Sequence, residues 1–157
     1  MQDRSKCAGW AALPLKRCGY CDDTDGMIQW NDSLATGHGI VDQDHQKLIA
    51  SLNELEAALK SGAGKDQIVA QIAFLNEYAR GHFTREEVHM QRVACPAYAD
   101  NRREHKLFVA RLDGWVSRLK SEGASTSLVL EVYRDTSTWI RDHILKTDCR
   151  LRGCQLS

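Results

Sequence analysis

Apolar residues recur at helical spacing in four stretches of the chain, each ended by residues that stop helices. In each stretch the leucine, isoleucine, valine or aromatic side chains lie three or four positions apart, which places them on one face of an α-helix. The expected helices cover residues 41 to 60, about 66 to 93, 100 or 101 to 122, and 125 or 126 to 144. No segment has the two-residue alternation of a strand, so the pattern predicts an all-α protein.

The residues between these stretches predict how the helices connect. Short polar residues that cap helices stand near three of the starts: Asp42, Asp100 or Asn101, and Ser125 or Thr126. Short linkers between helices of similar length favour antiparallel neighbours. We therefore expect an up-down-up-down antiparallel four-helix bundle over residues 30–150. Residues 1–29 would form an irregular N-terminal extension, and residues 151–157 a C-terminal tail.

Length and charge limit the classes of function. With 157 residues and 43% hydrophobic content, the chain is long enough for one domain with one core. Lys plus Arg and Asp plus Glu both total 21, so no net charge attracts nucleic acid or anionic lipid. No apolar run has the length of a membrane span. These features predict a soluble, cytoplasmic protein without a nucleic-acid or membrane partner.

The candidate chemistry lies in histidines and carboxylates distributed over all four expected helices. The candidate metal ligands are His45, His82, Glu86, His89, His105, His143 and Asp148. At about 100° per residue, His82, Glu86 and His89 share one helix face. Burying imidazoles and carboxylates between all four helices would cost several kcal/mol of desolvation free energy unless a metal or full pairing compensated for it. Imidazoles with carboxylates that can bridge two ions indicate a dinuclear iron or manganese site.

Several motifs resemble those of the hemerythrins, especially the bacterial hemerythrin-like domains. They are Trp30 and Gly37 ahead of Val41-Asp-Gln-Asp-His45-Gln-Lys-Leu48, then His82-Phe-Thr-Arg-Glu86-Glu87 with Met90, His105-Lys-Leu-Phe108, and Trp139-Ile-Arg-Asp-His143-Ile144 through Asp148. The resemblance implies two iron ions, bridged by Glu86, Asp148 and an oxo or hydroxo group. It also implies that dioxygen binds reversibly, as a hydroperoxide, at the open position of the iron held by His45 and His82.

The same resemblance implies an apolar wall around the open position, formed by Leu48, Phe83, Trp139 and Ile144. One position departs from the family. The third helix of the family usually carries two histidines four apart, and here the first of them is Asn101. His89 lies one turn beyond Glu86, and a helical side chain leans toward the helix N-terminus. We therefore expect His89 to supply the missing ligand. The alternative is that Asn101 or water fills the position and His89 forms hydrogen bonds elsewhere.

Two further groups of residues need a separate interpretation. His38, between Gly37 and Gly39, is expected to lie in a surface loop. The bundle topology could bring Cys18 and Cys21 near Cys149 and Cys154, which makes a zinc site or a redox pair conceivable. The spacing of Cys149 and Cys154 is not typical of zinc sites, and free cysteines are common in reducing compartments. We therefore do not favour that site, and Cys7 adds no pattern to it.

Three classes of function are compatible with this sequence. The first, which we favour, is a dioxygen-binding protein for storage, delivery or sensing, because no substrate cleft or catalytic base is visible. The second is an enzyme, a di-iron oxidase, peroxidase or nitric oxide-handling protein, which the change at Asn101 would permit by opening a second coordination position. The third is a signalling or iron-sensing module.

Overall fold

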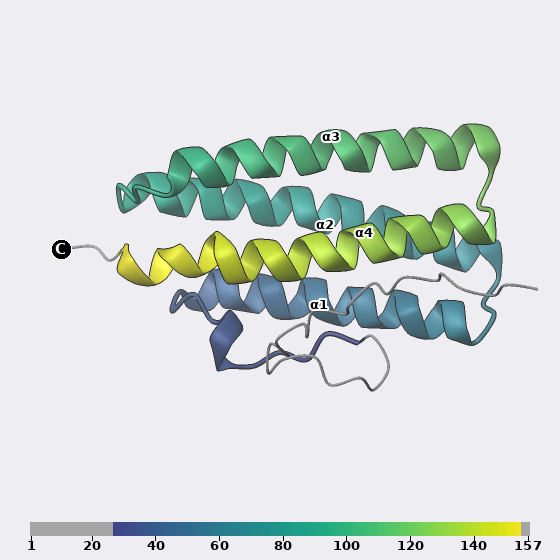
Figure 1. Cartoon of the computed structure of the whole chain (residues 1–157), viewed down its shortest axis with the longest axis horizontal. Coiled ribbons are helices and arrows are strands. Elements are labelled where there is room, and N and C mark those ends of the chain that lie inside the picture. Colours follow the sequence, from purple (N-terminus) through teal and green to yellow (C-terminus); the bar gives the residue numbers. More distant parts are fainter. Residues whose placement is uncertain (1–26, 155–157) are drawn as a thin grey trace, which may run out of the picture.

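Four long helices run alternately up and down in the computed structural model, which describes residues 27–154 (Figure 1). They are α1 (Gly39–Lys60), α2 (Lys65–Arg92), α3 (Tyr98–Glu122) and α4 (Thr126–Lys146). Two short 3₁₀ helices flank them, η1 (Asp32–Leu34) and η2 (Asp148–Gly153). The described residues contain no strand. The predicted antiparallel four-helix bundle is confirmed.

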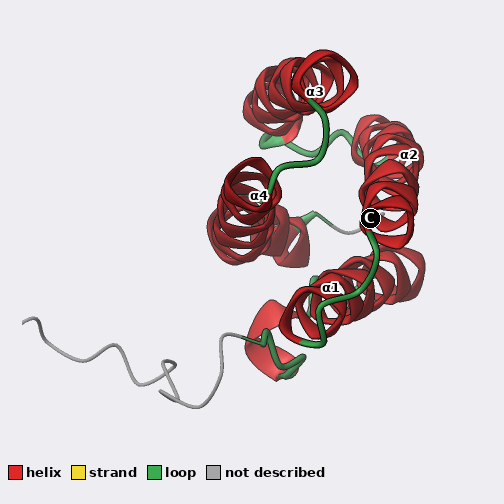
Figure 2. Cartoon of the chain, turned by 90° about the vertical axis from the view of Figure 1, so that its right-hand side faces the viewer, coloured by secondary structure: helices red, strands yellow, loops and turns green. Residues whose placement is uncertain are grey.

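Viewed along its axis, the bundle has one helix at each corner of a square (Figure 2). Helix α1 packs against both α2 and α4, and α2 also packs against α3. The sequential pairs α1–α2 and α2–α3 are therefore packed neighbours, as their short connections require. Within residues 27–154, no helix is long and apolar enough to cross a membrane.

The apolar stripes of the four helices meet along the centre of the bundle. Its most completely buried apolar side chains include Leu48, Leu52, Leu55, Phe108, Leu128 and Ile144, each at most 2% exposed. Burial of one such side chain stabilises the fold by about 1.5–3 kcal/mol. The apolar core is continuous on the side of the α1–α2 and α3–α4 connections. The buried polar residues gather toward the other end, where α1 and α3 begin and α2 and α4 end.

The helix starts differ in part from the predicted caps. Ser125 caps α4 as expected, because its hydroxyl accepts a hydrogen bond from the Leu128 N–H at 3.3 Å. Asp42, by contrast, lies inside α1, which begins at Gly39 after His38. The Asp42 carboxylate accepts hydrogen bonds from the backbone N–H and hydroxyl of Thr36 at 2.6 and 2.8 Å. Asp42 therefore stabilises the loop before the helix.

Helix α3 begins at Tyr98, two or three residues earlier than predicted. The residue in the N-cap position is Ala97, which has no capping side chain, so neither Asp100 nor Asn101 caps the helix. Asn101 consequently lies in the first turn, where its side chain is fully buried in the bundle. This position places Asn101 among the candidate metal ligands.

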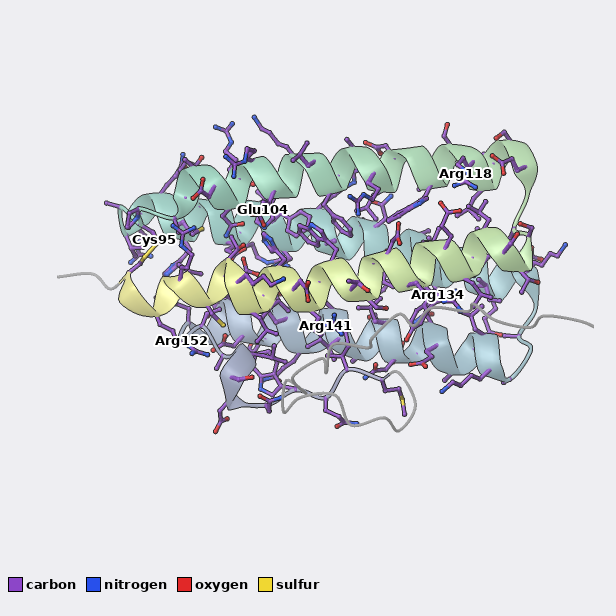
Figure 3. All side chains as sticks on the ribbon, viewed as in Figure 1. Cys95, Glu104, Arg118, Arg134, Arg141 and Arg152 are labelled. Atoms are coloured by element: carbon purple, nitrogen blue, oxygen red, sulfur yellow. A yellow bond between two sulfur atoms is a disulfide. The ribbon has the colours of Figure 1, made fainter. Side chains whose placement is uncertain are left out.

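The end of the chain is attached to the bundle through η2. Cys154 forms a disulfide with Cys95 in the α2–α3 turn, and Figure 3 shows this bond at the end of the bundle where Cys95 is labelled. Leu151 is fully buried, so packing continues into the segment expected to be a tail. The expectation of a free cysteine is wrong at Cys154, and the sequence analysis assigned no role to Cys95. Cys154 is not available to a zinc site with Cys149, while Cys7, Cys18 and Cys21 lie outside the described residues.

Candidate metal centre

Six of the seven predicted ligands converge inside the bundle. His45 comes from α1, His82 and Glu86 from α2, His105 from α3, His143 from α4 and Asp148 from the first residue of η2. All six side chains are buried, and none is more than 4% exposed. Their ligand atoms form two groups, within each of which every atom lies within 4.8 Å of the others: His45, His82 and Asp148 in one, and Glu86, His105, His143 and Asp148 in the other.

Asp148 belongs to both groups because its two carboxylate oxygens face opposite sides. Oδ2 lies 3.2 Å from His45 Nε2, and Oδ1 lies 3.1 Å from His143 Nε2. Glu86 stands between the same pairs of histidines. Its Oε2 is 3.4 Å from His105 Nε2 and 3.8 Å from His82 Nε2. Two carboxylates between two pairs of imidazoles are the arrangement that a pair of bridged metal ions requires.

Unpaired polar atoms show that these residues fit metal ions. Both oxygens of Glu86, Asp148 Oδ2 and His45 Nε2 are buried, and within residues 27–154 none has a hydrogen-bond partner of acceptable geometry. A buried polar atom without a partner costs roughly 1–3 kcal/mol, and more when it is charged. Four such atoms directed into one small volume indicate that cations complete the site.

The pKa values of the carboxylates and imidazoles reflect the same crowding. Burial and the negative charge of Asp148 raise the pKa of Glu86 well above its usual range. Burial opposes ionisation of Asp148 as well, but His143 and His45 outweigh it and lower the pKa of Asp148. Burial and repulsion by His143 lower the pKa of His105 to about 2. His105 is therefore neutral, which is the form of imidazole that binds metal.

Three further carboxylates contact the outer nitrogens of the ligand histidines. Glu104 Oε2 is 2.7 Å from His143 Nδ1 and Glu87 Oε1 is 3.1 Å from His105 Nδ1, both with hydrogen-bond geometry. Asp44 Oδ2 lies 3.5 Å from His82 Nδ1 as an ion pair only, which leaves that nitrogen without a hydrogen bond among residues 27–154. A carboxylate that accepts the outer N–H fixes the tautomer, so that Nε2 faces the metal. Sequence reasoning missed these residues. Glu104 acts on a histidine 39 positions away, which no local pattern reveals.

Two of the four residues expected to form the apolar wall lie directly on ligand rings. Phe83 stacks on His105 with ring centroids 3.9 Å apart, and Trp139 stacks on His143 at 4.2 Å. Leu48 and Ile144 are buried in the adjoining core. The two aromatic rings thus cover the His105 and His143 side of the centre most closely. Phe83 also approaches His82, with ring centroids 5.6 Å apart.

His89 does not join the six ligands. Its ring packs edge to face on His38, with centroids 4.2 Å apart, and it belongs to neither ligand group. His38, Val88 and His89 line a hollow between the start of α1 and the end of α2. The residue that lies at the ligand cluster is Asn101, the alternative considered from the sequence. Its Oδ1 is 3.1 Å from His143 Nε2, and its Nδ2 is 3.2 Å from Asp148 Oδ1.

Comparison with known proteins agrees with this geometry. Residues 36–151 match the hemerythrin HHE cation binding domain. The chain belongs to the hemerythrin family. Among its hemerythrin relatives is the bacteriohemerythrin of Stenotrophomonas maltophilia, 27% identical over 78% of this chain and 77% of the relative. The bacteriohemerythrin of Clostridium acetobutylicum is 26% identical over 78% of this chain and 96% of its own length.

More distant members of the hemerythrin family extend the comparison. The hemerythrin of Phascolopsis gouldii is 23% identical over 79% of this chain and 90% of its own length. A crystal structure of a mutant protein superposes with a TM-score of 0.74, at 23% identity, over 83% of this chain and 98% of that one. At this identity, the superposition supports the fold alone. Together with the ligand cluster, membership of the family makes the chain a hemerythrin-type metal-binding protein.

Proposed function

We propose that the centre holds two iron ions and binds dioxygen reversibly. The observation that carries the proposal is the position of Asp148, whose two oxygens each face a histidine of a different group at 3.1 and 3.2 Å. A carboxylate placed in this way can join two ions, and a single oxygen of Glu86 on α2, Oε2, also lies between one histidine of each pair, 3.4 Å from His105 Nε2 and 3.8 Å from His82 Nε2. Its relatives named hemerythrin and bacteriohemerythrin support iron and dioxygen as the cofactor and the ligand.

Each part of the site has a separate task in this function. His45 and His82 hold one ion, His105 and His143 hold the other, and the two carboxylates hold the ions together. Two irons bound there would supply the electrons that reversible dioxygen binding requires. The apolar side chains around the histidines exclude water, which protects reduced iron from oxidation. We place the protein among dioxygen-binding proteins and not among enzymes, a choice that its relatives named hemerythrin support.

An optical spectrum of the reduced, iron-loaded protein before and after exposure to air tests this function. We expect a charge-transfer band that appears in air and disappears when oxygen is removed, over repeated cycles. Rapid and irreversible loss of the absorption band in air would contradict reversible dioxygen binding and favour a di-iron oxidase. The variant Val88→Ala is a suitable control, because Val88 is 60% exposed and outside the ligand cluster.

A further inference from the structure

The imidazoles of the centre divide equally between its two halves. His45 and His82 contribute to one group, and His105 and His143 contribute to the other, while Asp148 is shared. No third histidine approaches either group, because His89 packs on His38 instead. The fifth polar side chain at the His105 and His143 half is Asn101, which is 0% exposed.

Two imidazoles and shared carboxylates leave an octahedral ion incompletely coordinated. Non-haem iron sites with two histidines and a carboxylate are known for open positions. Two histidines, one oxygen from each bridging carboxylate and one solvent-derived bridge make about five ligands of six. This count applies to both halves of the centre. We propose that each of the two ions has an exchangeable position, so that the centre binds two small exogenous ligands and not one.

The contacts of Asn101 explain why it does not permanently fill the second position. Its Nδ2 donates to Asp148 Oδ1 at 3.2 Å and lies 3.0 Å from Met90 Sδ, which fixes the orientation of the amide. Its Oδ1 is then directed toward His143 Nε2 at 3.1 Å. Once that nitrogen binds a metal it has no proton to donate. The Asn101 oxygen is left beside the ion as a neutral donor, weaker than an imidazole and displaceable by a small anion.

The surroundings limit the ligand to a small one. Phe83 and Trp139 stack on the two histidines of this half, and Met90 is completely buried behind Asn101. Because protein interiors are closely packed, a ligand beside Asn101 has to be small unless a ring moves. Azide and nitric oxide are small and bind iron directly. This inference rests on the proposed di-iron centre and adds to it a second site for small ligands.

Titration of the oxidised, iron-loaded protein with azide tests the inference, followed by calorimetry and by the iron-to-azide absorption band. The native protein should bind two azide ions per chain. The variant Asn101→His, which supplies a third imidazole, should lose one equivalent and bind one. A single equivalent in the native protein would overturn the inference, whether or not the histidine variant folds.

The variant His89→Ala is the matched control. It should bind two equivalents, as the native protein does, since His89 lies outside the cluster. If His89 did move to the metal as a third imidazole, the native protein would bind one equivalent and His89→Ala would bind two. Iron content, measured first on each sample, separates this inference from the proposed function. Fewer than two irons per native chain would contradict the proposed di-iron centre. Two irons that bind only one azide ion would contradict only the second exchangeable coordination position.

Discussion

The ligand histidines depend on carboxylates that never touch the metal. Glu104 is the closest of these, 2.7 Å from His143 Nδ1, and it also accepts a hydrogen bond from the Thr147 hydroxyl at 3.0 Å. It therefore connects α3 to α4 and to the residue before Asp148. Loss of such an outer contact generally leaves the ligand in place but less basic and less well oriented.

We expect Glu104→Gln to weaken iron retention by about 10–100-fold, the usual cost of losing an outer carboxylate. The shape of the side chain is preserved, but the amide no longer stabilises the N–H of His143 with a full charge. Competition with a soluble chelator measures the change. The control is Glu122→Gln, which alters an exposed carboxylate on the same helix that pairs only with Arg118 among the contacts described. Equal chelator sensitivity of both variants and the native protein would contradict this role.

Among the secondary-structure elements, η2 is the one on which the centre most depends. It begins with Asp148 and ends at Gly153, next to the disulfide between Cys154 and Cys95. Arg152 also attaches it to the chain before α1, because its guanidinium donates to the backbone oxygens of Ala35 and Ser33 at 2.6 and 2.7 Å. A six-residue 3₁₀ helix has little stability of its own, so these attachments keep Asp148 between the two pairs of histidines.

Removal of the disulfide should therefore weaken both metal binding and the stability of the fold. We expect Cys154→Ser to release iron faster to a chelator and to lower the free energy of unfolding by about 2–5 kcal/mol. A dithiol reductant should reproduce the effect in the native protein. The control is Cys149→Ser, which changes the free thiol of the same segment. Iron release that responds neither to reduction nor to Cys154→Ser would show that η2 is held without the disulfide.

At the scale of the whole molecule, the two buried carboxylates of the candidate centre lie toward the end of the bundle where α2 and α4 end. Glu86 and Asp148 are both 0% exposed, and burial of unpaired charge costs several kcal/mol per ion. We therefore expect metal binding to contribute directly to the stability of the folded state.

Removal of the metal should lower the melting temperature by on the order of 10 °C or more, since the buried carboxylates then lose their partners. Scanning calorimetry of the iron-loaded and chelator-treated protein measures the difference. Addition of ferrous iron under anaerobic conditions should restore the original value. Equal melting temperatures with and without metal would mean that protons or internal hydrogen bonds satisfy the site equally well.

The sequence predicted the bundle from helical periodicity, and it named the six residues whose side chains the structure brings together. His82 and Glu86 lie on one face by spacing alone, and the apolar stripes locate all four helices. His89 shares that face in angle, but it lies seven residues beyond His82, about 10 Å along the helix axis. At that height α2 meets the loop that contains His38, and the imidazole packs there. The helix angle alone did not predict that His89 lies outside the two ligand groups.

The remaining features depend on contacts between residues distant in sequence. The disulfide joins positions 59 residues apart, and no connectivity follows from the number of cysteines. Asp42 is a residue type that often caps helices. Here its carboxylate accepts a hydrogen bond from Thr36 in the chain before α1, and the helix begins three residues before Asp42, at Gly39. The disulfide pairing and the start of α1 are decided by tertiary contacts, which cannot be read from a single sequence.

The metal content of the purified protein tests the central claim most directly. We expect two irons per native chain, because Asp148 and Glu86 each face both pairs of histidines. Asp148→Ala and Glu86→Ala should each retain at most one tightly bound iron, while His89→Ala should retain two. One metal ion per native chain, or two tightly held irons in either carboxylate variant, would contradict the bridged dinuclear centre.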